Sequence, residues 1–192
     1  MREGYEDLKE FISNKTGNSI NKTGKIMTGF SQVVKDAIKR GDTVEVEGLV
    51  KIYFTTTTGI IYKNNIYNLE EQLDDLEEEL CLDRLEIKNV LVTYLKRIKE
   101  RVLDGYQVNL KGICYLIPKK EEGVITCIPR VSPVLYKPEM ADFVITTEEG
   151  IYLQELTEND LRFKIDIDED IEIIYELAEE SSEGLKLKEV NI

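Results

Sequence analysis

The sequence predicts an α+β fold made of two tandem helix–helix–β-hairpin repeats, followed by a β-rich C-terminal extension. Residues 26–54 combine an apolar stripe at helical spacing, a glycine and a strand-like alternation, and the same pattern returns 64 residues later. Beyond Gly150 the chain alternates apolar and polar residues again, outside the repeat. The apolar helical stripe, the two glycines and the strand-like alternation all recur in one register. This favours an internal duplication over two unrelated helix–strand junctions that happen to share the usual turn residues.

The two repeats are expected to pack through the apolar faces of their long helices. These faces must be buried, because apolar residues three and four apart lie on one side of a helix. The predicted packing residues are Ile26, Met27, Phe30, Val34 and Ile38 in the first repeat and Val90, Leu91, Tyr94, Ile98 and Val102 in the second. Gly41 and Gly105 stand where each long helix needs a left-handed end, and Gly48 and Gly112 mark tight reversals between strands.

The remaining elements follow from periodicity and capping residues. The expected helices span residues 5–15, from Ser19 or Asn21 to 39, 69–80 and from Asp83 to 103. The expected strands span residues 43–47, 50–55, 60–62, 66–67, 106–110, 113–117, 124–128, 151–153, 161–167 and 171–175. Pro129, Pro133 and Pro138 predict an extended segment poor in hydrogen bonds. The domain boundaries are therefore placed at 1–68, 69–145 and 146–192.

The net charge of −13 is unevenly distributed. Residues 146–192 carry 15 acidic and 4 basic side chains, so this segment accounts for most of the imbalance and the rest is near neutral. Neither part has the basic excess that duplex binding normally requires. No apolar run approaches the roughly 18 residues that span a bilayer, and the N-terminus has no apolar signal segment. We therefore expect a protein made and kept in the cytoplasm unless it is packaged elsewhere.

The order helix, break, long helix, glycine, hairpin and arm resembles the HU/IHF family of histone-like proteins. Residues 8–54 carry this resemblance in the first repeat, and residues 85–117 carry it in the second. Residues 132–145 (SPVLYKPEMADFVI) are similar to the closing aromatic-Lys-Pro turn and short final helix of the family. The resemblance implies a dimer, and two linked copies are expected to form a pseudo-dimer within one chain, because a unit of this size buries too little surface alone.

The predicted arms depart from the family, whose long basic arms carry Arg-Asn-Pro at the tip and bend DNA. The first arm (TTTTGIIYKNN) has a single lysine, Lys63, and no proline. In the second, Lys119 and Lys120 are followed directly by Glu121 and Glu122. DNA bending is therefore not carried over. The residues left as possible nucleic-acid contacts are Lys63, Lys119, Lys120 and Arg130, and an alternative basic patch comprises Lys35, Lys39, Arg40, Lys96, Lys99 and Arg101.

No catalytic chemistry is predicted, and neither a metal nor a cofactor is expected. The chain has no histidine, and its three cysteines are expected to be structural thiols, with Cys81 buried at a helix–helix junction and Cys114 and Cys127 paired in the core. Asp166, Asp168 and Asp170 begin like a calcium loop, but position six is not glycine and position twelve is not glutamate. They are interpreted as a solvent-facing row of a strand.

The expected function is that of a non-enzymatic structural or assembly protein. Tandem HU/IHF-like proteins of this kind are similar to those encoded as IHF subunits among the structural genes of crass-like tailed phages. That resemblance implies a virion component, assembled in the host cytoplasm, that forms an oligomeric ring at the neck or tail and contacts portal or tail proteins. The alternatives are a divergent cytoplasmic DNA-binding architectural protein and an acidic DNA mimic that uses residues 70–79 and the tail.

Overall fold

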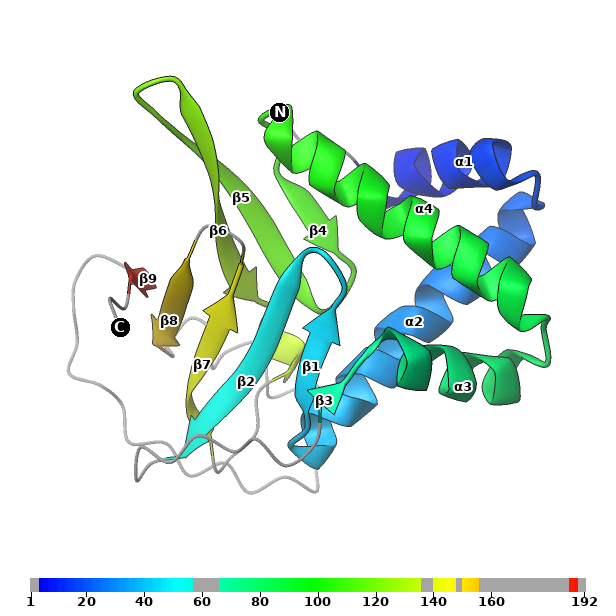
Figure 1. Cartoon of the computed structure of the whole chain (residues 1–192), viewed down its shortest axis with the longest axis horizontal. Coiled ribbons are helices and arrows are strands. Elements are labelled where there is room, and N and C mark those ends of the chain that lie inside the picture. Colours follow the sequence, from blue (N-terminus) through cyan, green and yellow to red (C-terminus); the bar gives the residue numbers. More distant parts are fainter. Residues whose placement is uncertain (1–3, 57–65, 136–139, 148–149, 156–186, 190–192) are drawn as a thin grey trace.

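The computed structural model describes residues 4–56, 66–135, 140–147, 150–155 and 187–189. Four helices pack together on one side of the molecule, and two sheets lie on the other (Figure 1). The predicted α+β class is confirmed. Among the described residues, no helix is both long and apolar enough to cross a membrane.

The helices fall into two pairs with the same spacing. They are α1 (Tyr5–Thr16), α2 (Ile20–Arg40), α3 (Leu69–Leu80) and α4 (Arg84–Leu103). The first residues of α1 and α3, and those of α2 and α4, are each 64 positions apart. Ser19 caps α2 by accepting a hydrogen bond from the Lys22 N–H, and Asp83 caps α4 in the same way from Leu85 and Glu86. Both capping predictions are confirmed.

Strands of the first half form a six-stranded sheet with strands from the end of the chain. Its order is β3-β1-β2-β7-β8-β9. The strands are β1 (Thr43–Val46), β2 (Val50–Thr56), β3 (Ile66–Tyr67), β7 (Met140–Thr146), β8 (Ile151–Glu155) and β9 (Leu187–Glu189). All neighbours are antiparallel except β1 and β3, which are parallel.

A three-stranded sheet belongs to the second half. It contains β4 (Val108–Leu110), β5 (Cys114–Glu121) and β6 (Val124–Val131) in that order, and a short 3-10 helix, η1 (Pro133–Leu135), follows. The β1–β2 and β4–β5 reversals place Gly48 and Gly112 at φ values of 70° and 69°, a left-handed conformation that costs glycine little. The prediction of tight reversals at these two glycines is confirmed.

The predicted closing helix within residues 132–145 is wrong. Residues 133–135 form η1, and residues 140–146 form β7, which pairs with β2 of the other sheet, for example through Ile52 and Ile145. The sequence near residues 140–146 does not indicate this pairing, because the strand that covers the free edge of β2 lies far from it along the chain. Ile145 is fully buried as a result.

The predicted extended, hydrogen-bond-poor segment is only partly correct, since Pro129 is extended but lies in a paired strand, Pro133 is helical, and Pro138 falls outside the described residues. Pro129 lies within β6, opposite Leu116, and Pro133 opens η1. A proline is tolerated in β6 because this is an edge strand, where the missing N–H need not serve a further neighbour.

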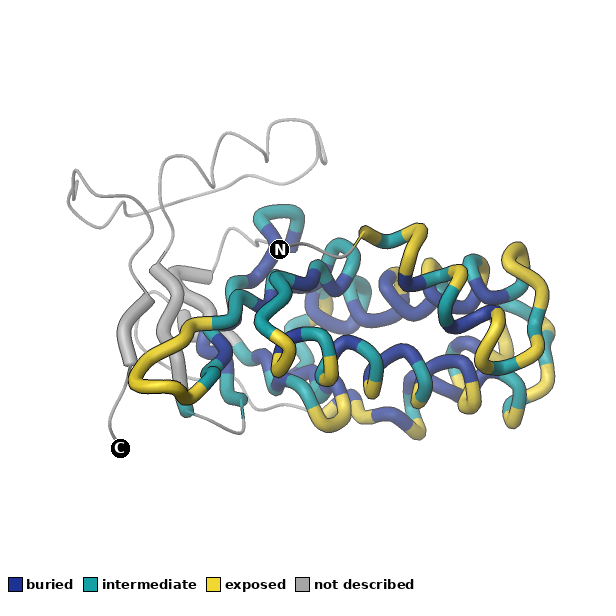
Figure 2. Tube along the Cα trace, turned by 90° about the horizontal axis from the view of Figure 1, so that it is seen from above, coloured by how far each residue is buried: buried dark blue, intermediate teal, exposed yellow. Residues whose placement is uncertain are grey.

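One continuous hydrophobic core joins the helices to both sheets (Figure 2). It contains all ten residues predicted to pack the two long helices together, each no more than 5% exposed. Two contacts join positions 64 apart. The rings of Phe30 and Tyr94 meet edge to face with centroids 6.4 Å apart, and Lys22 Nζ lies 3.0 Å from the Glu86 carboxylate. Each short helix also packs against the long helix of the other half, α1 on α4 and α3 on α2.

Candidate functional site

The most prominent surface feature is a two-stranded arm formed by the outer parts of β5 and β6 (Figure 1). Strand β4 pairs with β5 only as far as Leu116, so residues beyond it form a ribbon of two strands. Its tip is a two-residue turn at Glu122 and Gly123, both with positive φ, which suits the twist of a hairpin. Among the described strands, none pairs with this outer part of the arm.

The arm carries balanced charge. Lys119, Lys120 and Glu121 are exposed, and Lys119 Nζ lies 2.7 Å from a carboxylate oxygen of Glu121. Lys119 and Lys120 lie on opposite faces of the ribbon, because neighbouring residues of a strand alternate. Arg130 lies at the base, opposite Tyr115, and Lys63 falls outside the described residues. The structure does not gather Lys119, Lys120 and Arg130 into one cationic patch.

A second group of cations lies where the end of α2 meets the β4–β5 turn. Lys35 reaches over Gly112, so closely that a Cβ on that glycine would lie 2.5 Å from Lys35 Cε. Burial lowers the pKa of Lys35, and the nearby charges of Lys111 and Lys39 lower it further. Lys111 also sits over the Tyr5 ring, at 4.2 Å from its centroid. Sequence reasoning missed Lys111, whose only signal was its place beside the turn glycine.

The two arginines of the alternative basic patch interact with their own surroundings. Arg40 pairs with Asp42 at 3.1 Å and lies over the Tyr67 ring. Arg101 pairs with Asp104 at 3.2 Å and lies 3.4 Å from the centroid of the Tyr106 ring. These contacts hold both guanidinium groups against the protein, so they favour a structural role for the two side chains.

The acidic face of α3 is partly neutralised by the start of α4. Arg84 bonds to the Glu70 and Asp74 carboxylates and lies 3.6 Å from Glu77, while Lys88 lies 3.1 Å from Glu70. Hydrogen bonds from Arg84 and then Lys88 hold the pKa of Glu70 below its ordinary value of 4.5. The acidic side chains of this part of the predicted acidic surface therefore link α3 to α4 through ion pairs.

Replacing Arg84 with glutamine is expected to raise the pKa of Glu70 toward 4.5, because the largest stabiliser of its charged form is removed. A carboxylate with a lowered folded pKa stabilises the fold above its unfolded pKa, and the contribution is lost as pH falls through the folded value. Titration of the Glu70 carboxyl carbon by NMR measures the shift. Lys88→Gln is the matched control with a smaller rise, and an unchanged Glu70 titration in Arg84→Gln contradicts the assignment.

The cysteines differ from expectation in one respect. Cys81 is exposed and ends α3 with a φ of 51°, so the prediction of a buried thiol there is wrong. The left-handed turn that reverses the chain into α4 directs this position outward. Cys114 and Cys127 are buried thiols outside any disulfide, and burial raises the pKa of the Cys114 thiol. They are not register partners, since Cys114 lies opposite Val131 and Cys127 opposite Pro118.

No group of three or more Cys, Asp or Glu residues in the described part of the chain is arranged to hold a metal ion. Asp166, Asp168 and Asp170 lie outside the described residues.

Comparison with known proteins agrees with the HU/IHF resemblance in the first third of the chain. Residues 5–65 match the model of the family described as bacterial DNA-binding protein. No curated protein matches the chain. The matched residues include α1, α2, β1 and β2, so this part of the chain is HU/IHF-like. Proteins of that family are non-enzymatic architectural proteins that self-associate and bind DNA.

Proposed function

We propose that this protein is a non-enzymatic assembly protein built on two HU/IHF-like repeats that pair within one chain. Residues 1–68 and 69–145 would be the repeats, and residues 146–192 an acidic β-rich extension. Residues 140–145 are shared, since they continue the second repeat in sequence while pairing with β2 in space.

Internal pairing is supported by contacts between equivalent positions. In a two-fold symmetric dimer, residues near the axis meet their own copies. Phe30 meets Tyr94 and Lys22 meets Glu86, and both pairs are 64 residues apart. The crossed packing of α1 on α4 and of α3 on α2 has the same symmetry. The equivalent positions hold Phe and Tyr in one case and Lys and Glu in the other. This suggests two copies whose residues have diverged so that they complement each other.

The observation that favours assembly over DNA bending is the chemistry of the arm. Lys119 is paired with Glu121, and the turn itself contributes Glu122. Phosphate contacts require cations that can replace condensed counterions, so an arm with balanced charge gains little from a duplex. The same arm, with exposed Val124 at its end, offers apolar surface to a protein.

The proposed setting is a tailed-phage virion, in which copies of the chain form a ring at the neck or tail and contact portal or tail proteins. The resemblance to tandem IHF-type proteins of crass-like phages supports this setting. The protein would be assembled in the host cytoplasm and retained in the particle. A ring requires a head-to-tail contact that closes on itself.

Native mass spectrometry and electron microscopy of the purified protein, alone and with portal and tail proteins, test this proposal. We expect closed oligomers of defined copy number or a stable complex with the virion proteins. A strict monomer that associates with none of them contradicts it.

DNA binding is the second candidate function, because the match to bacterial DNA-binding proteins covers residues 5–65. Fluorescence anisotropy of a labelled duplex, titrated with salt, distinguishes the DNA-binding function from the assembly function. We expect only weak binding at about 150 mM salt, and tight binding that falls steeply with added salt would favour the DNA-binding function. The double variant Glu121→Lys/Glu122→Lys should bind more tightly and steepen the salt slope by up to about 2. An unchanged slope would mean that the arm does not approach the duplex.

A further inference from the structure

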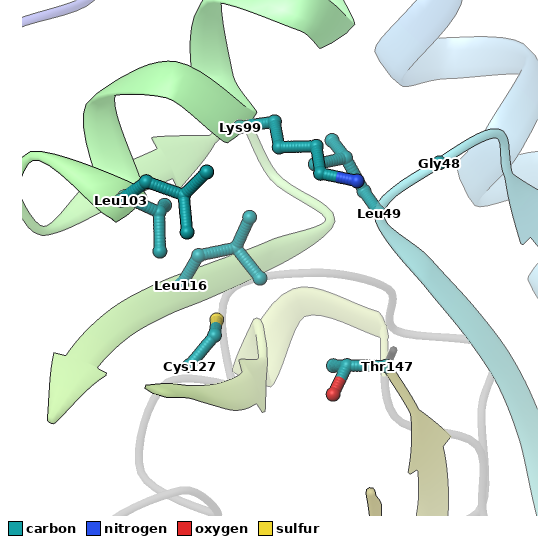
Figure 3. Close-up of a pocket in the computed structure, with 8 residues that line it drawn as sticks. Gly48, Leu49, Lys99, Leu103, Leu116, Cys127 and Thr147 are labelled. Atoms are coloured by element: carbon teal, nitrogen blue, oxygen red, sulfur yellow. The ribbon is translucent and has the colours of Figure 1, made fainter. Parts of the chain in front are cut away.

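A small apolar cavity lies at the end of α4, between the β1–β2 turn and the base of the arm (Figure 3). Its volume is about 120 Å³, and its lining includes Leu49, Val102, Leu103, Leu116 and Cys127, with Lys99 at the edge. Leu103, the last residue of α4, is 50% exposed. A cavity near this size with such a lining can bind one small apolar group.

The equivalent place in the other half is covered. The chain leaves β6 through Ser132, whose N–H donates to the Ile113 carbonyl at 2.8 Å, and then forms η1 against α2. Leu135 of η1 is fully buried, and so is Ile113. At the cavity, the chain leaves β7 differently, because the Thr147 N–H donates to Gly150 and β8 begins at Ile151.

Within the described residues, no counterpart of η1 covers this cavity as it covers the equivalent place in the other half. Lys35 lies over Gly112 at that equivalent place, and Lys99 lines the cavity with Gly48, both pairs being related by the 64-residue shift. Leu49, the counterpart of Ile113, is only partly buried. A branched apolar side chain supplied from outside would bury Leu49 and Leu103, whereas Ile113 is already fully buried in the other half.

We propose that this cavity receives the arm tip of a second copy of the chain, with Val124 as the inserted side chain. Val124 is 62% exposed at the end of a ribbon that extends roughly 15 Å beyond its supporting strand. Glu122 lies in the turn beside it, and Lys99 in the cavity lining carries the opposite charge. The cavity, at about 120 Å³, is large enough to receive one branched side chain. The inference rests on the proposed assembly role and specifies its contact.

The contact is directional, because the tip of one copy meets the cavity of the next. Such heterologous contacts repeat from copy to copy and produce a ring when the rotation closes. Tip and cavity belong to different surfaces of the same molecule, so a variant in either leaves the other intact. This property allows a complementation experiment.

Val124→Asp in the tip and Leu103→Asp in the cavity should each raise the dissociation constant for self-association at least tenfold, measured by native mass spectrometry and sedimentation velocity. An equimolar mixture of the two variants should form a one-to-one dimer and nothing longer, because only one good contact remains. Leu85→Asp is the matched control. Leu85 is 75% exposed on α4 and distant in sequence from Leu103, and its variant should assemble like the parent.

Disulfide trapping tests the same contact directly. In a Cys81→Ser background, Val124→Cys should cross-link to Cys127 of a neighbouring copy under diamide and give a ladder of covalent oligomers. The two positions in one chain are about 10 Å apart along β6, too far for an internal bond. Adding Cys127→Ser should abolish the ladder.

The outcomes separate the contact from the assembly role. Oligomers that survive both aspartate variants, with no cross-link, overturn the contact and leave the assembly role standing. A parent protein that stays monomeric at every concentration overturns the contact, and the assembly role then depends on binding to portal or tail proteins. Loss of assembly in both variants with recovery of a dimer on mixing supports the contact.

Discussion

Replacing Phe30 with alanine is expected to lower the free energy of unfolding by about 3–5 kcal/mol. Phe30 is fully buried and meets Tyr94 edge to face, so its removal leaves a cavity between the two long helices. Because one core serves both halves, the variant should unfold in a single transition at lower denaturant concentration. Denaturation followed by circular dichroism and by fluorescence measures it.

A double-mutant cycle isolates the contact between the halves. Phe30→Ala, Tyr94→Ala and the double variant should reveal a coupling of about 0.5–1.5 kcal/mol, the usual range for an aromatic pair. Leu85→Ala, at a position 75% exposed, is the control and should change stability by no more than about 0.5 kcal/mol. Additive effects, or two separate unfolding transitions, would contradict a shared core.

Replacing Ile145 with alanine is expected to cost about 2–5 kcal/mol, although this residue lies far outside the segment that matches bacterial DNA-binding proteins. Ile145 is fully buried and lies opposite Ile52 of β2. Its loss should destabilise the sheet of the first half. Chemical denaturation gives the energy, and amide hydrogen exchange at Ile52 reports the site.

The matched control for Ile145 is its neighbour Thr146, which points to the other side of β7 and is partly exposed. Thr146→Ala should cost less than about 1 kcal/mol. If Ile145→Ala leaves the exchange of Ile52 unchanged while lowering protection in β5, then β7 completes the other sheet and the observed topology is incorrect.

The helices were predictable because their signals are local. Residues 69–80 carry leucines at helical spacing and an Asn68 cap that accepts bonds from Glu70 and Glu71, and α3 has the predicted bounds. Gly48 and Gly112 predicted the two strand reversals correctly, because few other residues tolerate the positive φ that these turns require. The charge of the arm was also readable, since Lys119 and Glu121 are close in sequence.

The strand partners were not predictable, because hydrogen bonding between strands leaves no local trace of which strand lies beside which. Residues 140–146 have the alternation of a strand, but their sequence does not indicate that they pair with β2. The cluster of Lys35, Lys111 and Tyr5 joins three elements and appears only after folding. Cys81 was misjudged for a different reason: the usual burial of cysteine was outweighed by its place in a left-handed turn.

The position of β7 beside β2 has a consequence for how the protein is made. Lys51 pairs with Thr146, so β2 waits for its neighbour until most of the chain has left the ribosome. At typical synthesis rates this delay is on the order of ten seconds, during which the edge of an early strand is open to other chains. Newly made copies gathered near one another could therefore exchange this strand during synthesis, and slower translation between the two segments would increase the yield of such entangled pairs.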